Sequence, residues 1–570
     1  MPTRRHSTQL AFSRLLLMLV GGLHLVPAAL AGEPLHKRID ALVAARAGGE
    51  LCLASSDPVF VRRAYLDFAG RIPSATETRA FLAENAGDKR AKLIDRLTDS
   101  PEYARHMTEF LHVMLMERLG DDEAWRMFLE TSLAENKPWD QVVQQILHPE
   151  PDEEKLRGAA FFITKRLENY GQNPVDMPGL VRDIGRLFLG VDVQCAQCHD
   201  HLFVDDYKQQ TYQGLLAFVG HTFIRRDVEF PAVGERVLTK KVDYKSVFLQ
   251  EDRSTGPKLL DGEEVEIPIF AKGEEYLVAP DKKTRFPGTP KFSPLHLLSE
   301  QLPRRSNAAF KQNIVNRLWW KLMGRGLVEP LDLHHSQNPP SHPEVMALLV
   351  EEFEAHEFDV KWLLCQLASS QTYQRSSRMA TTGDSTVEVT HPPATSYRIA
   401  LERPLSAEQI LASVWQATGP FPISAAKAAT ETTEETGDQE TSTDMAEESD
   451  SPPTLDELRE KFVAALANPP REPEIGINPT VKAALFMMND DAVLQLLTPR
   501  DDNLIARLTA LDSADQIADE LYLSILSRQP NAVEQAEVTE YLVSHSSHRT
   551  PALTDLAWAL LASTEFLVNH

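Results

Sequence analysis

The chain has 570 residues, too many for a single hydrophobic core, so its length predicts two or three domains. Its composition, 42% hydrophobic and 25% charged, is typical of an ordinary globular protein. The formal net charge of −25 argues against nucleic acid and anionic membranes as partners, because both would repel an acidic protein.

The N-terminal segment, residues 1–31, has the pattern of a secretory signal peptide. Basic residues precede an apolar run over residues 15–30, and small residues lead to a cleavage site near Ala31. No later stretch has the apolar length of a membrane span. The sequence therefore predicts an exported mature protein, periplasmic or extracellular, without a membrane span.

Most of the mature chain shows the start signals and periodicity of helices. Five segments have the form of a capping box ahead of apolar residues at helical spacing, and they begin at Ser74, Ser341, Ser406, Thr454 and Ser513. The predicted fold class is mainly α, a multi-helical two-domain protein. We expect an N-terminal helical domain over residues 32–222 and a C-terminal helical domain in two parts, 293–420 and 456–570.

Two segments interrupt the helical pattern. Over residues 223–292 polar and apolar residues alternate, as in Glu264-Val265-Glu266-Ile267, which predicts a small β-rich insert. Between residues 431 and 460 the chain has twelve acidic residues and one arginine, with few apolar residues. We therefore expect a disordered acidic insert over residues 421–455.

A pattern near the start of the mature chain recurs near residue 570. The shared residues are Tyr65-Leu66, Arg71, Pro73 and Glu77 in the first copy and Tyr522-Leu523, Arg528, Pro530 and Glu534 in the second. A later block, Ser100-Pro101-Glu102-Tyr103, matches Ser563-Thr564-Glu565-Phe566. These matches predict either a duplicated helical unit, with ion pairs at its helix ends and copies that pack together, or convergent amphipathic helices.

The segment from Cys195 to His201 gives the most specific functional signal. It contains Cys195-Ala196-Gln197-Cys198-His199, the Cys-x-x-Cys-His pattern of covalent c-type haem attachment. In this interpretation each thiol is linked to the porphyrin of haem c, and His199 is the proximal iron ligand. The sixth ligand would be Met177, His201 or His221, or the sixth position would stay open.

Two other interpretations of this segment remain open. In one, Cys195 and Cys198 bind zinc or another transition metal together with His199 or His201, and Asp200 or Asp205 is a further candidate ligand. A haem motif does not need the second histidine, so its presence weakens the haem interpretation. In the other, the two cysteines form a redox or structural disulfide. The remaining cysteines, Cys52 and Cys365, either pair or stay separate buried thiols.

Several segments resemble a planctomycete family, the cytochrome-like domain of unknown function, joined to its usual C-terminal companion, also of unknown function. The matching residues are 59–73, 188–191 and 195–201 for the first domain, and 316–319, 324–328, 340–344, 370–373, 403–409 and 563–566 for the second. The resemblance covers nearly the whole mature chain and implies no established activity. The family usually has His-Pro-Phe where this chain has His201-Leu202-Phe203.

Two further clusters give weaker signals. They consist of His334, His335, His342 and Glu344, and of Asn316, Arg317 and Trp319. The first either binds a hydrolytic metal or opens a helix, and the second either binds a ligand such as a sugar or forms a packing network.

Two classes of function follow from these signals. The first is an exported haem-binding (c-type-like) protein, in electron transfer or as a redox enzyme, that uses a separate redox partner. The second is a metal- or disulfide-stabilised binding or assembly protein at the cell surface, with polysaccharide or protein partners. No nucleophile elbow, phosphate loop or dinucleotide fingerprint occurs in the chain, so no catalytic residue is assigned.

Overall fold

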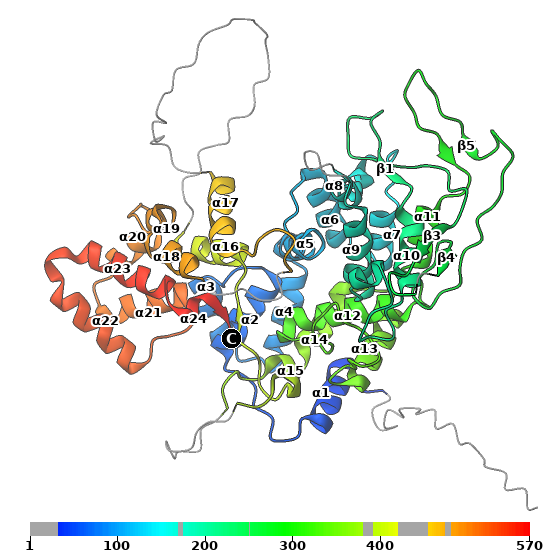
Figure 1. Cartoon of the computed structure of the whole chain (residues 1–570). Helices are drawn as coiled ribbons and strands as arrows, with labels where there is room; N and C mark the ends of the chain where they lie inside the picture. Colours follow the sequence, from blue (N-terminus) through cyan, green and yellow to red (C-terminus); the bar gives the residue numbers. More distant parts are fainter. Residues whose placement is uncertain (1–31, 169–174, 250, 380–390, 420–453, 474–479) are drawn as a thin grey trace, which may run out of the picture.

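The computed structural model of the chain describes residues 32–168, 175–249, 251–379, 391–419, 454–473 and 480–570. Over these residues the protein is mainly α-helical, with its strands in four two-stranded ladders, which confirms the predicted fold class (Figure 1). The predicted signal peptide lies outside the described residues. The predicted acidic insert, residues 421–455, also lies outside them, except for Thr454 and Leu455 at the start of a helix. None of the described helices is long and apolar enough to span a bilayer.

The first group of helices occupies the residues expected for the N-terminal domain. These helices are α1 (Leu35–Arg46), α2 (Asp57–Phe68), α3 (Ala75–Ala83), α4 (Lys89–Thr98), α5 (Pro101–Met116), α6 (Glu123–Ala134), α7 (Trp139–Leu147), α8 (Phe161–Leu167), α9 (Met177–Leu189) and α10 (Gln209–Val219), with the 3₁₀ helices η2 (Glu154–Ala160) and η3 (Gln194–Gln197). Every residue of α2 from Phe60 to Phe68 is buried, so this helix lies inside the protein.

The segment expected to be β-rich contains three antiparallel ladders. They pair β1 (Thr222–Ile224) with β2 (Val233–Glu235), β3 (Val242–Lys245) with β4 (Asp252–Thr255), and β5 (Tyr276–Val278) with β6 (Thr289–Pro290). Strands β3 and β4 pack on α10. This contact places part of the insert beside the Cys-x-x-Cys-His segment.

The second group of elements follows the insert. It contains α11 (Pro294–Gln301), α12 (Ala308–Met323), α13 (Pro343–Ala355), α14 (Val360–Ser369), α15 (Gln371–Gln374), η4 (Ala394–Ser396), β7 (Arg403–Pro404), α16 (Ala407–Thr418), α17 (Leu455–Leu466), α18 (Val481–Asn489), α19 (Asp491–Leu496), α20 (Leu504–Thr509), α21 (Ala514–Ile525), α22 (Ala532–Ser544), η5 (Ser546–His548), α23 (Arg549–Leu561), α24 (Thr564–Leu567) and β8 (Val568–Asn569).

Buried side chains in the described residues form two hydrophobic cores. The larger core combines α1 to α10 with α11 to α15, so it contains residues from both predicted domains. The smaller core is built from α16 to α24 and also takes in Leu66 and Ile72 from the N-terminal region. Strand β7 pairs with β8 next to α2, and α21 packs on α3. The C-terminal helices therefore pack on the N-terminal half, as the repeat predicted.

The predicted duplication is present in the structure. Helix α2 and its counterpart α21 both have 12 residues and begin and end at equivalent positions of the repeat. The next helix begins with a capping box in each copy, formed by Ser74 with Glu77 and by Asn531 with Glu534. Common helix bounds and a common cap indicate a repeated unit rather than unrelated amphipathic helices.

Each copy also contains an arginine that bridges two glutamates. The pairs are Arg71 with Glu77 and Glu102, both at 3.0 Å, and Arg528 with Glu534 and Glu565, at 2.8 and 2.6 Å. In both copies the guanidinium carbon lies 5.2 Å from the ring centroid of a tyrosine, Tyr65 or Tyr522. The predicted ion pairs at helix ends are thus confirmed.

Three of the five predicted capping boxes are present, at Ser74, Ser406 and Thr454. The box predicted at Ser341 is wrong, because α13 begins one residue later and the hydroxyl of Ser341 contacts the His342 ring at 3.3 Å. At Ser513 a helix begins as predicted, but the serine side chain makes no cap hydrogen bond. A capping sequence therefore located the helix starts to within about one residue but did not fix the side-chain contact.

Candidate functional site

The Cys-x-x-Cys-His segment lies between α9 and α10; its first three residues belong to the single 3₁₀ turn η3, and Cys198 caps that turn. Helix α9 ends at Leu189, and the left-handed conformation of the next residue, Gly190 (φ 70°), turns the chain towards this segment. Ala196 is buried beneath the turn, whereas Cys195 and Cys198 are exposed free thiols. The turn therefore presents both sulfur atoms at the protein surface.

Two glutamines of α10 fix the turn. The side-chain amides of Gln209 and Gln213 both donate to the backbone carbonyl of Gln197, at 3.3 and 3.0 Å. The backbone N–H of Gln209 donates to the carboxylate of Asp200 at 2.8 Å. Because the carbonyl lies between the two cysteines, these bonds hold the thiols in a defined arrangement on the first turn of α10.

The ring of His199 has a defined tautomer. Its Nδ1 lies 2.6 Å from the backbone carbonyl oxygen of Asp200, and a carbonyl can only accept, so Nδ1 carries the proton. In the neutral ring Nε2 then has the lone pair, which is the state required of a histidine that ligates a metal. The ring also packs against Phe248, with centroids 4.7 Å apart.

Exposed apolar side chains border the segment. Leu202 and Phe203 follow it directly and are 64% and 79% exposed. A second group, residues 247–249, is joined to it by a hydrogen bond of 3.2 Å from the backbone N–H of Val247 to the carbonyl of Cys198. We call these five residues, Leu202, Phe203, Val247, Phe248 and Leu249, the apolar rim. Large apolar side chains gathered at a surface typically mark a ligand or interaction site.

His201 has a local structural contact. Its Nδ1 accepts hydrogen bonds from the backbone N–H groups of Phe203 and Val204, at 3.2 and 2.9 Å, and so closes the loop that follows the motif. Within the described residues, no group of three or more His, Cys, Asp or Glu side chains is arranged to hold a metal ion. The side chains considered for zinc, those of Cys195, Cys198, His199 and His201, therefore do not converge in this structure.

Other residues considered from the sequence lie elsewhere. His221 follows the C-terminal end of α10, whereas the motif is held at its N-terminal end, and an 11-residue helix is about 16 Å long. Met177 packs against the larger core. Cys52 and Cys365 are separate free thiols, in contact with the Arg378 carbonyl and with the Thr98 hydroxyl. Of the two alternatives expected for Cys52 and Cys365, the structure therefore contains two unpaired thiols and not a disulfide.

Two residues of the weaker clusters, Asn316 and Trp319, make packing contacts. The side chain of Asn316 exchanges hydrogen bonds with the backbone of Val328, at 2.8 and 3.0 Å, and Trp319 packs edge-on against Tyr397. Burial, with help from Arg317, lowers the pKa of His334 to about 4, so this ring is neutral. These contacts form a helix-packing network at Asn316 and Trp319.

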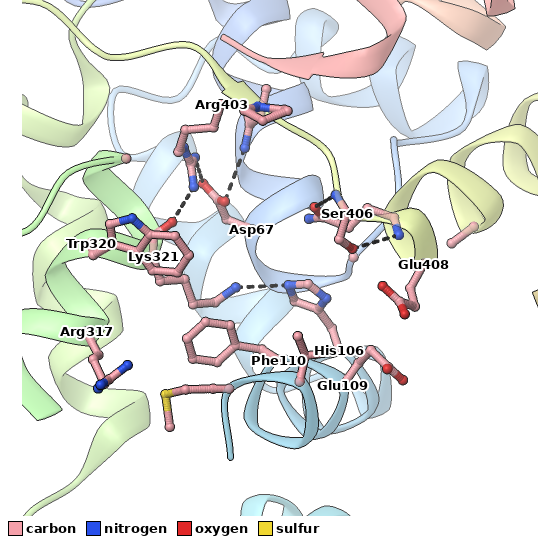
Figure 2. Close-up of a pocket in the computed structure, with 18 of the residues that line it drawn as sticks. Asp67, His106, Glu109, Phe110, Arg317, Trp320, Lys321, Arg403, Ser406 and Glu408 are labelled. Atoms are coloured by element: carbon pink, nitrogen blue, oxygen red, sulfur yellow. Dashed lines mark hydrogen bonds and ion pairs between the residues drawn. The ribbon is translucent and has the colours of Figure 1, made fainter. Parts of the chain in front are cut away.

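One group of residues was not singled out from the sequence. A cavity of about 390 Å³ is lined by α5, α12, α16 and the segment of Arg403, and it contains Lys321, His106 and Asp67 (Figure 2). The three residues belong to three different helices, and no spacing rule connects them. The sequence offered one signal, a lysine within the apolar run of residues 318–323.

Comparison with known proteins finds two family models along the chain. Residues 38–223 match PSCyt2, described as a protein of unknown function (DUF1549), and residues 296–542 match PSD1, described as a protein of unknown function (DUF1553). No curated protein and no solved structure matches the chain. Strands β2 to β6 lie between the two matched regions.

Proposed function

Because this chain joins a member of the PSCyt2 family to a member of the PSD1 family, both of unknown function, we propose its role from its own residues. We propose that it is an exported, c-type-like haem-binding protein that acts in electron transfer or as a redox enzyme. The observation that carries this proposal is the contact of 2.6 Å between His199 Nδ1 and the Asp200 carbonyl oxygen, which directs the Nδ1 proton to the carbonyl and leaves Nε2 as the nitrogen for iron.

The residues of the site suit covalent haem. Cys195 and Cys198 are free, exposed and held one turn apart, so both thiols are accessible for thioether formation. His199 follows directly and supplies the proximal nitrogen. The apolar rim offers hydrocarbon contacts for a porphyrin face, which water solvates poorly. Bound haem would supply one-electron chemistry, and its attachment requires export, in agreement with the expected signal peptide.

The test is to express the full chain with its N-terminal segment in a bacterial host that has a periplasmic haem c maturation system. We expect a pyridine haemochrome spectrum of a c-type haem and a Soret band that survives acid–acetone extraction. Cys195→Ser and Cys198→Ser should each reduce covalent haem. The matched control, Cys365→Ser, replaces a cysteine outside the motif and should retain full haem content.

Histidine variants separate the ligand from its neighbour. His199→Ala should keep the thioethers but change the haem spectrum, whereas His201→Ala should leave the spectrum unchanged, because His201 closes a loop. Stoichiometric zinc without a Soret band would overturn the proposal in favour of a metal-stabilised binding or assembly protein at the cell surface. A Cys195–Cys198 disulfide in the exported protein, again without haem, would favour the disulfide-stabilised form of that alternative.

A further inference from the structure

The cavity of about 390 Å³ lies where the two halves of the chain meet. Helix α5 comes from the N-terminal half, and α12, α16 and β7 come from the C-terminal half (Figure 2). Its volume falls in the range of about 300–1,000 Å³ that is typical of small-molecule pockets. Much of the wall is apolar, with contributions from Phe110, Val113, Met114, Trp320 and Leu331.

Lys321 reaches this cavity from α12, and its side chain is buried. Among the described residues no carboxylate is in ion-pair contact with its amine. Instead Nζ lies 3.1 Å from Nε2 of His106 and 4.7 Å from the ring centroid of Phe110 (Figure 2). A buried ammonium group without a carboxylate partner is costly, so Lys321 loses its proton more easily than an exposed lysine does.

Asp67, the nearest buried carboxylate, is committed to other donors. Its Oδ2 accepts from Arg403 and from the hydroxyl of Tyr373, both at 2.8 Å. Its Oδ1 accepts from the side-chain amide of Asn569 at 3.1 Å. These three donors satisfy the carboxylate, so it does not bind the Lys321 amine directly.

His106 is placed to accept a proton from this amine. Its ring also bonds the backbone carbonyl of Asp67, so the proton is on Nδ1 and Nε2 faces Lys321. Gly70 provides the space, since a Cβ on its left-handed backbone (φ 72°) would lie 2.5 Å from Nδ1. Burial, with help from Lys321, holds the pKa of His106 well below its usual value, so the ring is neutral. Burial, with help from Arg403, lowers the pKa of Lys321 to about 8.

We propose that this cavity binds a small aldehyde or ketone with an apolar body, and that Lys321 holds it as an imine. The Nζ lone pair of Lys321 forms a bond to the carbonyl carbon while the C=O π pair moves to oxygen. His106 Nε2 takes one proton from the nitrogen and passes it to the oxygen, which gives a carbinolamine. It then takes the second nitrogen proton and passes it to the hydroxyl, which leaves as water with the C–O electron pair as the nitrogen lone pair forms the C=N bond. One carbonyl and one amine give one imine and one water, so no oxidant or reductant is required.

Two features of the cavity support this class of ligand. An amine is a nucleophile only when it is neutral, and a desolvated lysine is the residue that forms Schiff bases in proteins. The aromatic side chains of Phe110 and Trp320 suit a flat or hydrocarbon body. The site is separate from the Cys-x-x-Cys-His turn, so the proposal holds independently of haem binding.

The test uses the full chain and 2-naphthaldehyde as the probe, with sodium cyanoborohydride to reduce any imine to a stable amine. Peptide mass spectrometry should find Lys321 modified at least tenfold more than the other lysines of the same sample. Glyoxylate, a small anionic aldehyde, is the second probe, and it should label Lys321 less than the naphthaldehyde does. Stronger labelling by glyoxylate would overturn the apolar preference.

Matched variants complete the test. Lys311→Met removes a lysine of the same helix that is ion-paired with Glu354, and it should leave the labelling of Lys321 unchanged. Lys321→Met should abolish the specific label, and His106→Gln should slow the labelling of Lys321 without changing that of other lysines. If Lys321→Met does not fold, the proposal is still tested by how the label is distributed over the lysines of the natural chain. Uniform labelling of surface lysines with Lys321 unmodified would overturn the proposal.

Discussion

The guanidinium of Arg62 donates a hydrogen bond of 2.7 Å to the backbone carbonyl of Phe566, 504 positions further along the chain. The same side chain donates to the carbonyl of Ile525 at 3.1 Å. Arg62 is buried, and burial lowers its pKa to about 10, so it remains charged at neutral pH. A charge from the first repeat is therefore satisfied by the backbone of the second, and the two repeats fold as partners.

Replacing Arg62 should destabilise the protein through this contact. In Arg62→Met the carbonyls of Ile525 and Phe566 lose buried donors, and we expect a loss of about 2 kcal/mol in the free energy of unfolding. The measurement is the shift of the urea midpoint. Arg79→Met is the control, because Arg79 joins Glu520 across the same interface but is half-exposed, and its loss should cost less than about 1 kcal/mol. Equal losses in the two variants would contradict this account.

The glutamates bound by Arg528 should make stability depend on acid pH. The hydrogen bond from Arg528 lowers the pKa of Glu534 below its ordinary value of 4.5, although partial burial raises it. Burial raises the pKa of Glu565, but the hydrogen bond and charge of Arg528 outweigh it and the pKa is lowered. This stabilisation is complete above pH 4.5 and is lost as the pH falls through the lowered values.

We therefore expect the melting temperature of the natural chain to fall as the pH drops below about 4.5, and the fall to be smaller in Arg528→Met. Arg549→Met is the control, because Arg549 contacts the backbone carbonyl of Leu511 rather than a carboxylate. An Arg528→Met protein with the same pH dependence as the natural chain would rule out this pair of contacts as the cause.

Lys321 should react with acylating reagents at a lower pH than an ordinary lysine. Burial lowers its pKa to about 8 from the ordinary 10.5, helped by Arg403 and opposed by Asp67. The titratable and charged groups that line the cavity with it are Asp67, Arg105, His106, Glu109, Glu117, Arg317, Glu402, Arg403 and Glu408. Competitive acetylation across a pH series should give half-maximal reactivity near pH 8 for the folded chain, and at a higher pH in urea.

The same shift has a consequence for stability. The folded state releases the Lys321 proton at a lower pH than the unfolded chain, so the unfolded chain binds more protons between about pH 8 and pH 10.5. The contribution of Lys321 therefore becomes more favourable as the pH rises through this window, and Lys321→Met should remove that part of the slope. Half-maximal acetylation of the folded chain near pH 10.5 would refute both expectations.

The apolar rim should bind a hydrophobic dye when haem is absent. We expect the full chain without haem to enhance the fluorescence of anilinonaphthalene sulfonate, and Phe248→Ser to reduce the enhancement by about half, because Phe248 contacts His199 within the rim. Ile269→Ser is the control, since Ile269 is 98% exposed outside the rim. If the control reduces the signal as much as Phe248→Ser does, the rim is not the dye site.

The sequence predicted those features that depend on neighbours along the chain. Ser74 and Glu77 form their capping box because both residues lie within one helical turn, and the Arg71 and Arg528 contacts follow from the repeated spacing. The box at Ser341 failed because tertiary contacts moved the start of the helix: His342 is buried against Tyr397 and takes the cap position. At such positions tertiary packing, rather than the local sequence pattern, determines the residue at which the helix begins.

The cavity residues could not be predicted in this way. Lys321 lies in a run of tryptophan, leucine and methionine that predicts only a buried helix. Its partner His106 lies 215 positions earlier in the chain, and the contact between them depends on how α5 and α12 pack. When helices far apart in the chain bring reactive residues together, the spacing of those residues in the sequence does not reveal the site. The Cys195–His199 motif is contiguous, so it can be recognised from the sequence alone.

The hydrogen bond from Asn569 to Asp67 has a consequence for the timing of synthesis. The two residues are 502 positions apart, so Asp67 leaves the ribosome about 25 to 100 seconds before Asn569 at ordinary translation rates. Until then the buried carboxylate lacks one of its three donors, and β7 lacks its partner strand. The cavity wall can therefore be completed only after residue 569 has been made, and a chaperone that delays premature collapse of the earlier helices would act within that interval.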